Sequence, residues 1–511
     1  MVLHVFAHNP WMDRKPGMTL DGIGVYFQRD QTWWKQGSAW ITYLQRCQFL
    51  LQQGRPVVDI AVFTGEEVPR RALLPDRLIN TLPGIFGQEK VEREKIRLQN
   101  TGTPLRQKPD GVIHSANMAD PEDWADALNG YAYDSFNPDA LLHGASVKNG
   151  RIVLPGGASY AMLVVPYGHP MQPNAGYMSV AVAKKIQQLL NSGATVLMST
   201  KYNRAISSGS GENDNALPAI MEAIASGKQT GRRIDIPYTG ASFKDLGLQK
   251  DVDIINNPHS IVWTHRQTTT ADIYFIANQK DSLQDMAVSF RVSGKQPELW
   301  NAVTGEISNT ANWKADNGRT IVTLQLPANA SVFVVFRNKT ALQEQRVMAP
   351  LPAKSLFLNN HWQVHFDTAY GGPAAPVDLD SLISWTGLTD NRVKYYSGTA
   401  VYSNSFEWKT ATVPKSIWLS LERIENIATI KVNGKNCGTL WTPPYRVDIS
   451  GALKSGNNTI EITVANTWAN RLIGDQFLPE KERITWTTAP FRLKDKPLLP
   501  AGIIGNVKIE W

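Results

Sequence analysis

The chain has few cysteines, few charged residues and no long apolar run, and each shortage excludes a class of protein. Among 511 residues there are two cysteines, Cys47 and Cys437, which define no disulfide framework, no CxxC pair and no zinc site. No apolar run approaches the roughly 18–20 residues of a membrane span. The opening residues also lack the basic and apolar regions of a signal peptide.

Charge is sparse and evenly spread. Charged residues make up 19% of the chain, and the net charge of +7 is not gathered into any Lys- or Arg-rich run. We therefore expect no nucleic-acid partner. Aromatic residues are plentiful by contrast, with 16 Trp and 15 Tyr. Such rings stack on the apolar faces of sugars, but aromatic β-sandwich cores give the same count.

Patterns for nucleophilic catalysis and phosphate binding are absent. There is no GxSxG elbow, and the Gly- and Ser-rich residues 208–214 lack a following Lys. Cys47 lies in a predicted helix as a buried small hydrophobe. Glu66 and Glu67 follow a strand and are interpreted as solvated loop carboxylates, while His259 and His265 are interpreted as structural. No catalytic residue is assigned.

The first half of the chain alternates helices and strands. Apolar spacing predicts a helix over 37–53 and an amphipathic helix over 180–194, with buried strands at 57–65 and 195–200. Residues 150–166 are typical of a strand pair around a Pro-Gly-Gly turn. We also expect a helix within 123–141, and an insertion with one or two helices at 66–120. This order predicts a parallel α/β sheet.

After about residue 250 the pattern becomes all-β. Short strands at close intervals predict a β-sandwich over 251–340. A Pro- and Ala-bearing linker follows at 341–354, and a second all-β domain runs over 355–511.

The opening residues combine strand and loop features. Apolar residues alternate with His4 and His8, which share one face of the strand, and the strand breaks at Asn9-Pro10 before Trp11. Strand ends that release such residues into a loop build the rim of carbohydrate sites in α/β barrels. No strand or helix precedes this one, so we expect the chain to be the C-terminal portion of a larger enzyme.

Motifs in the last domain point to a known module. Its V-N-G turn, G-x-x-W strand, P-Y-x-V-D-I segment and N-x-I-x-V-x-V-x-N-x-W segment resemble the galactose-binding-like jelly roll of glycoside hydrolase family 2. Asn433-Gly434 suits a two-residue hairpin turn, in which both positions have positive φ. Asp448 is expected to tie the loop that follows it.

Five sequence blocks occur in order near the N-terminus: H-x-x-x-H-N-P-W, P-G-M-T, F-x-R-x-Q-T-W-W, a helix ending L-L-Q-Q-G and a strand ending V-F-T-G-E. Together they resemble glycoside hydrolase family 106, the inverting α-L-rhamnosidases. The resemblance spans essentially the whole chain. It implies a multidomain α/β plus all-β fold. The expected parts are the last strand and rim loop of a truncated (β/α)8 barrel (1–38), an amidotransferase-like α/β domain (39–250), a β-sandwich (251–340), a linker (341–354) and a jelly roll (355–511).

The resemblance also implies an activity. The family removes terminal α-L-rhamnose from glycans by inversion, with two glutamates on the barrel and a calcium ion that engages the sugar hydroxyls. By this resemblance both glutamates lie upstream of Met1, so no catalytic residue and no metal ligand is assigned to this chain. We expect the chain alone to be inactive and the missing N-terminal part to be its partner. A periplasmic or secreted location is implied by the family.

The rim residues are the expected contacts to a rhamnose-containing glycan. They are His4, His8, Asn9, Trp11, Gln31 and Trp33. For His4 a hydrogen-bonded core position is the alternative, and Gln31, Trp33 and Trp34 fit either the site or packing at a helix start. Two other functions stay open, which are a non-catalytic carbohydrate-binding or assembly module and a glycosidase of other specificity.

Overall fold

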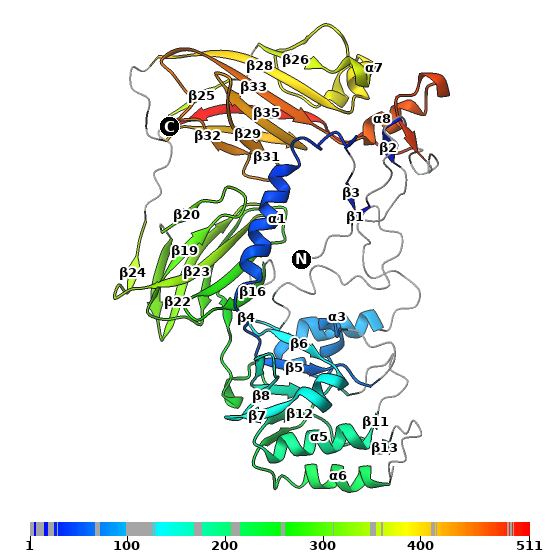
Figure 1. Cartoon of the computed structure of the whole chain (residues 1–511), viewed down its shortest axis with the longest axis vertical. Coiled ribbons are helices and arrows are strands. Elements are labelled where there is room, and N and C mark those ends of the chain that lie inside the picture. Colours follow the sequence, from blue (N-terminus) through cyan, green and yellow to red (C-terminus); the bar gives the residue numbers. More distant parts are fainter. Residues whose placement is uncertain are drawn as a thin grey trace.

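The computed structural model describes most of the chain. The described residues are 5–6, 15–18, 25–27, 29–66, 72–98, 126, 128–167, 176–205, 215–256, 261–309, 311–347, 354–358, 361–409, 414, 416–487, 490, 493 and 495–511. In Figure 1 an α/β unit lies at one end, a jelly roll lies at the other and a β-sandwich lies between them. Within this part of the chain, no helix has the length and apolar character to cross a membrane.

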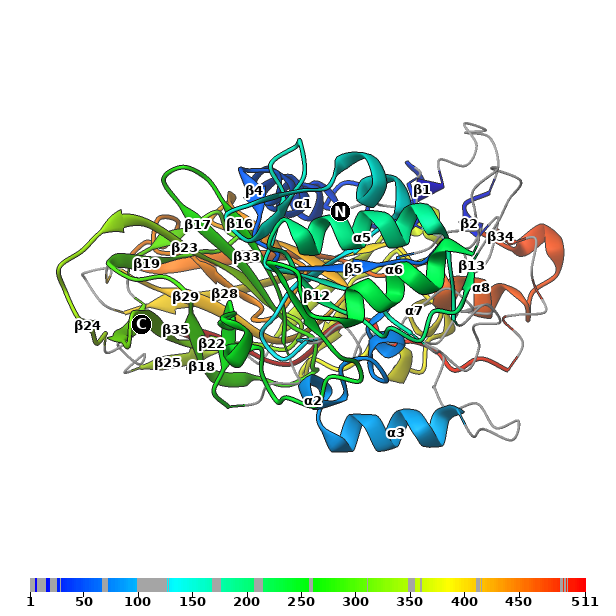
Figure 2. The same cartoon turned by 90° about the horizontal axis from the view of Figure 1, so that it is seen from below.

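A parallel five-stranded sheet forms the α/β unit, in the order β14-β12-β10-β5-β6. Apolar side chains lie on both of its faces, as expected for a parallel sheet covered on both sides. Helices α5 and α6 lie side by side on one face, and Figure 2 shows α3 set apart from them beyond α2. The elements are β5 (Ile60–Phe63), β6 (Tyr133–Phe136), β10 (Met162–Val164), β12 (Thr195–Leu197), β14 (Arg232–Ile234), α2 (Pro83–Phe86), α3 (Gln88–Leu98), α5 (Val180–Asn191) and α6 (Ala216–Ala225).

The parallel sheet, the helix at 180–194 and the strand pair around Pro-Gly-Gly are confirmed. That pair is β8 (Arg151–Val153) with β9 (Ser159–Tyr160), and β7 (Ser146–Lys148) joins its other side. Within the range 123–141, where a helix is expected, the described residues include β6, which pairs with β5, and the start of a short helix, η2 (Ala140–Gly144). Residues 123–125 and 127 lie outside the described residues, so this expectation stays a prediction.

The sandwich consists of two antiparallel sheets over one core. One sheet has the order β15-β18-β22-β21-β24, and the other has the order β20-β19-β23-β17-β16-β4. Its strands are β4 (Arg55–Pro56), β15 (Val252–Ile254), β16 (Ile261–Gln267), β17 (Asp272–Asn278), β18 (Gln284–Phe290), β19 (Lys295–Trp300), β20 (Ile307–Ser308), β21 (Asn312–Asp316), β22 (Arg319–Leu326), β23 (Ser331–Lys339) and β24 (Glu344–Gln345).

The helix predicted at 37–53 is confirmed as α1 (Ser38–Leu51), but it does not pack on the α/β sheet. Its Cys47 and Leu50 are buried against Phe333 and Val335 of the sandwich. The physical reason is that β17 and β23 carry apolar residues on their outer face as well, and α1 covers that face. Cys47 is a free, buried thiol, as the sequence predicted.

The jelly roll has a four-stranded sheet, β25-β35-β29-β32, and a six-stranded sheet, β27-β26-β28-β33-β30-β31, around an aromatic-rich core. The predicted hairpin turn is confirmed, because Asn433 has φ 50° and Gly434 has φ 75°. Asp448 ties its loop by accepting from the Ser450 backbone N–H at 2.8 Å. The strands are β25 (Ser355–Phe357), β26 (Trp362–Phe366), β27 (Val377–Leu379), β28 (Thr399–Trp408), β29 (Trp418–Glu425), β30 (Ile427–Val432), β31 (Lys435–Leu440), β32 (Arg446–Asp448), β33 (Gly456–Ala465) and β35 (Gly502–Glu510).

Near the N-terminus, β1 (Val5–Phe6) pairs in parallel with β3 (Val25–Tyr26). One parallel pair does not define a barrel, so the barrel remnant stays a prediction.

Candidate functional site

The predicted rim is described only in part. His4, His8, Asn9 and Trp11 lie outside the described residues. Gln31 and Trp33 lie in the turn that leads into α1. The Gln31 carbonyl accepts from the Trp34 backbone N–H at 3.0 Å.

Trp33 belongs to an aromatic cluster at the start of α1. Its ring meets the Phe27 ring edge-to-face at 5.6 Å, and Phe27 also contacts Trp34 and Trp40. The backbone N–H of Gly37 donates to the Trp33 carbonyl at 2.8 Å. A Cβ on Gly37 would come within 2.8 Å of the Trp33 ring, so glycine permits this packing. The cluster fixes the turn that carries Gln31.

The rim docks on the jelly roll, although more than 400 residues separate the two segments. Strand β2 (Gly17–Met18) pairs in parallel with β34 (Trp486–Thr487), and the Trp486 backbone N–H donates to the Pro16 carbonyl at 2.9 Å. Gly17 has φ 145°, and a Cβ there would overlap the Trp486 carbonyl oxygen. The Lys15 ammonium also donates to the Arg483 carbonyl.

Side-chain hydrogen bonds reinforce the docking beside Gln31. The Trp468 indole N–H donates to the Asp30 carbonyl at 2.9 Å, and the Thr32 hydroxyl donates to the Asn466 carbonyl. The turn is therefore held from the jelly roll on both sides of Gln31.

The supporting jelly-roll segment is itself rigidly held. Helix α8 (Ala469–Asp475) contains the buried residues Arg471 and Asp475. One carboxylate oxygen of Asp475 accepts from the backbone N–H groups of Ile484 and Thr485, at 3.0 and 2.7 Å, and from the Thr485 hydroxyl. Burial lowers the pKa of Arg471 against the opposing effect of Asp475.

This contact leaves aromatic surface in reach of a ligand. Trp34 is 39% exposed and Trp486 is 48% exposed. Exposed indoles beside a polar turn can stack on a sugar ring, while an amide such as that of Gln31 exchanges hydrogen bonds with its hydroxyls. The part played by residues 466–487 was missed from the sequence, because no local pattern signals a contact between such distant segments.

Glu66 corrects an expectation. It is not a free, solvated carboxylate, because it is half-buried and accepts from the Ser179 backbone N–H at 2.8 Å. Ser179 caps the N-terminus of α5, where a negative charge is stabilised by the helix dipole. The structure thus places Glu66 in a helix-capping role, and Glu67 lies outside the described residues.

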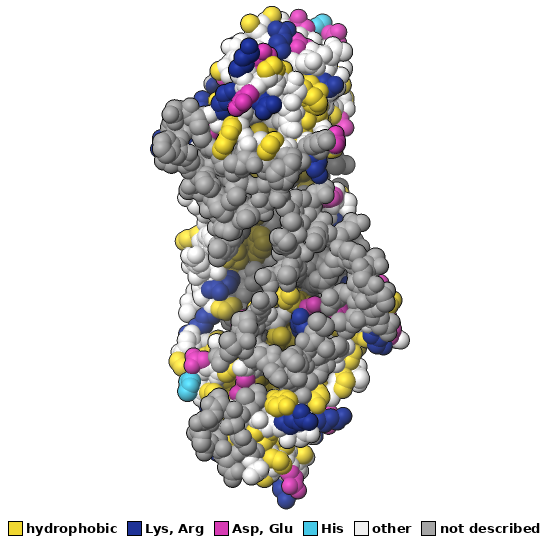
Figure 3. Space-filling model, turned by 90° about the vertical axis from the view of Figure 1, so that its right-hand side faces the viewer, with side chains coloured by type: hydrophobic (Ala, Val, Ile, Leu, Met, Phe, Trp, Pro, Cys, Tyr) yellow, Lys and Arg dark blue, Asp and Glu magenta, His cyan; other side chains and the backbone are white. Residues whose placement is uncertain are grey.

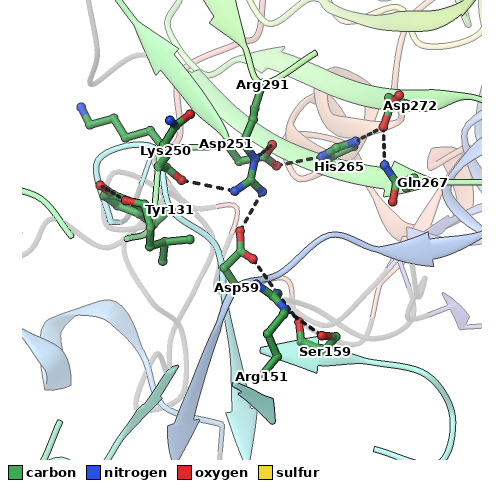
Figure 4. A network of polar contacts seen from close by, with 12 residues as sticks. Asp59, Tyr131, Arg151, Ser159, Lys250, Asp251, His265, Gln267, Asp272 and Arg291 are labelled. Atoms are coloured by element: carbon green, nitrogen blue, oxygen red, sulfur yellow. Dashed lines mark hydrogen bonds and ion pairs between the residues drawn. The ribbon is translucent and has the colours of Figure 1, made fainter. Parts of the chain in front are cut away.

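A network of paired charges connects the α/β unit to the sandwich (Figure 4). Asp59 precedes β5, and its two carboxylate oxygens accept from Arg151 at 2.8 Å and from Arg291 at 2.7 Å. Arg151 lies on β8, whereas Arg291 follows β18 of the sandwich. Asp59 therefore binds one cation from each unit.

The network of paired charges also includes His265 on β16, which is 4% exposed. Its Nδ1 lies 2.8 Å from Asp251, and its Nε2 lies 3.4 Å from Asp272. Burial lowers the pKa of His265, but the contacts with both carboxylates outweigh burial and raise it. Burial raises the pKa of Asp272, but His265 and Lys295 together bring it below its usual range. This geometry fits the structural role expected for His265.

In the described ranges, no group of three or more His, Cys, Asp or Glu side chains is placed to hold a metal ion. No calcium ligand is therefore assigned among the described residues.

Surface charge is mixed on the face drawn in Figure 3. Dark-blue Lys and Arg and magenta Asp and Glu side chains lie together over the jelly-roll end, rather than in separate patches. The described side chains on this face form no basic stripe of the kind that tracks a nucleic-acid backbone.

Comparisons with known proteins agree with the fold. The model of glycoside hydrolase family 106, alpha-L-rhamnosidase, matches residues 1–103 and 114–314, and a glycosyl hydrolase 2 galactose-binding domain-like model matches 385–489. A solved rhamnosidase from Novosphingobium sp. PP1Y superposes with a TM-score of 0.77 at 31% identity, over 99% of this chain and 44% of that one.

A curated relative from Formosa agariphila, a putative beta-glucuronidase, is 24% identical and covers 100% of this chain and 60% of the relative. The chain thus spans about half the length of both proteins. Because the first family match covers more than half of the chain, and a solved rhamnosidase is alike over nearly all of it, the chain belongs to the alpha-L-rhamnosidase family, glycoside hydrolase family 106.

Proposed function

We propose that this chain is the C-terminal part of a glycoside hydrolase that removes terminal α-L-rhamnose from glycans by inversion. The observation that carries the proposal is the likeness to a solved rhamnosidase along 99% of the chain. Inversion uses a general acid at the leaving oxygen and a general base that activates water on the opposite face of the sugar.

We assign the chain a positioning role in this reaction. Gln31 and Trp33, on a turn held by Phe27 and Trp468, contact the sugar together with His4, His8, Asn9 and Trp11 of the opening segment. Holding a sugar hydroxyl in a fixed place lowers the barrier, because orientation is established before the reaction begins. The two glutamates are supplied by a part of the enzyme that this chain does not contain, and the chain alone is inactive.

A glycosidase of other specificity is the second candidate, favoured by the relative named as a putative beta-glucuronidase. An assay with paired substrates distinguishes the two. The protein encoded by the longest reading frame that contains this chain is given an aryl α-L-rhamnoside and an aryl β-D-glucuronide. Preferred hydrolysis of the rhamnoside, with β-L-rhamnose as the first anomer in the NMR spectrum, supports the proposal. Preferred hydrolysis of the glucuronide contradicts it.

Gln31→Ala in that longer protein tests the positioning role. We expect kcat/KM for the rhamnoside to fall about tenfold or more, because a hydrogen bond to the sugar is lost. Gln48→Ala on the same helical region, remote from the turn, is the matched control and is expected to leave kcat/KM unchanged. Equal effects of the two substitutions on kcat/KM would show that Gln31 does not contact the sugar.

A further inference from the structure

A groove of about 1070 Å³ lies on the jelly roll, and nothing in the proposed reaction uses it. Side chains from the outward face of the six-stranded sheet form its floor, and β25 and the residues around it border one side. Strands β26 and β28, which carry much of the floor, lie at the top of Figure 1. The volume is at the upper end of the range of about 300–1,000 Å³ found for small-molecule sites.

The floor is an ordered row of polar side chains. Strand register places Asp378 beside Gln363, Gln363 beside Ser403, and Ser403 beside Glu461, across β27, β26, β28 and β33. Strands lie ~4.8 Å apart, so the row is about 14 Å long. A second pair on the same face, Ser405 with Thr459, lies two residues further along the strands.

Much of this hydrogen-bonding capacity is unused. Gln363 donates to Asp378 at 3.1 Å. In the described part of the chain, the side chains of Asp380, Ser403 and Glu461 have no hydrogen bond or ion pair. Phe357 on the border of the groove is 55% exposed and offers an apolar ring face.

The charge of the lining narrows the ligand class. The lining contains two Asp, two Glu and one His side chain and no Lys or Arg, which disfavours phosphates, sulfates and uronates, although Lys409 lies 4.0 Å from Glu407 at one border. The row has a carboxylate at each end with an amide and a hydroxyl between them, and no described cluster of acids suits a metal ion. Sugar hydroxyls match this arrangement, because each can donate to a carboxylate and accept from an amide or hydroxyl.

We propose that this groove is a second, non-catalytic site that binds an uncharged oligosaccharide. It is separate from the rim. The rim docks where Asn466 follows β33, whereas the groove uses Ser403 and Ser405, further along the paired strand β28. Ser405 lies six positions after Thr399, which is opposite the end of β33, and six positions span roughly 20 Å along a strand. The proposal does not depend on which glycosidic bond the enzyme cleaves.

Binding to the purified chain tests the proposal by isothermal titration with three probes. They are a neutral oligosaccharide capped with α-L-rhamnose, the same backbone capped with glucuronic acid, and hexalysine. We expect saturable binding of the neutral probe, and weaker binding both of the acidic probe and of hexalysine. Glu461→Ala and Ser403→Val are each expected to weaken neutral-probe binding by about tenfold.

Thr463→Val is the matched control, because Thr463 lies on β33, two residues from Glu461 on the same face, and outside the groove. It is expected to bind as the unchanged chain does. Thermal melting shows whether each variant is folded, and a Gln363→Leu variant replaces any that is not. The proposal is overturned if the neutral probe does not bind, if hexalysine binds in its place, or if the groove variants bind as well as the control. Each result is independent of any hydrolysis assay.

Discussion

At the scale of single residues, the docking of the rim depends on atoms that are closely packed. Gly17 lies against the Trp486 carbonyl with a backbone conformation that other residues rarely adopt. The Trp468 indole and the Thr32 hydroxyl then connect the turn to the jelly roll. A rim built this way transmits the rigidity of the jelly-roll core to the residues proposed to contact the sugar.

Replacement of Gly17 tests this contact. We predict that Gly17→Ala costs about 2 kcal/mol of stability, because the new Cβ overlaps backbone and the φ of 145° is strained. Limited proteolysis is expected to cut the N-terminal segment faster, and thermal melting gives the stability change. Gly156→Ala is the control, since no atom lies within 4 Å of a Cβ there. Equal protection of both variants would contradict the docking.

Protonation of His265 gives a second residue-scale prediction. Its pKa is raised in the folded protein, so its stabilising contribution is complete below the unfolded pKa of 6.5 and is lost as the pH rises through the folded pKa. Asp251, Asp272, Lys295 and Arg291 are the charged groups around it.

We predict that His265→Gln destabilises the chain by about 3 kcal/mol at pH 6, because it removes the buried cation that lies between Asp251 and Asp272. The difference in unfolding free energy between this variant and the unsubstituted chain is expected to be smaller at pH 9. Urea unfolding at both pH values measures it, and a difference that grows with pH would show that the imidazole is neutral in the folded state.

At the scale of elements, helix α1 links the rim to the sandwich. It begins directly after the Trp33 cluster and buries Cys47 and Leu50 on the outer face of β17 and β23. Its periodicity predicted the helix and its buried face correctly. The partner of that face could not be predicted, because apolar spacing shows that a face is buried but not what covers it.

Substitutions at Leu50 and at its neighbour Phe49 distinguish the contribution of packing from that of helix propensity. We predict that Leu50→Ala costs about 3 kcal/mol, because it leaves a cavity against the sandwich. Phe49→Ala, at a position 65% exposed on the same helix, is expected to change stability by less than about 0.5 kcal/mol. Chemical denaturation measures both, and similar costs would mean that α1 does not rest on the sandwich.

The difference between local patterns and distant partners also explains which other elements could be predicted. The parallel sheet and the Asn433-Gly434 turn follow from local patterns, and both were predicted. The strand β6 was not, because its pairing with β5 lies outside its own segment. Glu66 was interpreted as solvated for the same reason, since its partner Ser179 is more than a hundred residues away.

At the scale of the whole molecule, the chain joins an α/β unit, a sandwich and a jelly roll through buried charges and shared surfaces. Asp59 connects the first two with Arg151 and Arg291. The jelly roll holds the rim through β34 and Trp468. Under the proposed function, these contacts place one side of a sugar site that the rest of the enzyme completes.

The measurement that tests this account most directly is the turnover of an aryl α-L-rhamnoside by the purified chain alone, with a cooperative melt as proof that it is folded. The account predicts no release of the aryl group above the buffer rate, because a folded rim without its two carboxylates can bind and orient a sugar but cannot hydrolyse it. Sustained turnover by the chain alone would contradict the account, since it would place the catalytic acid and base within these 511 residues.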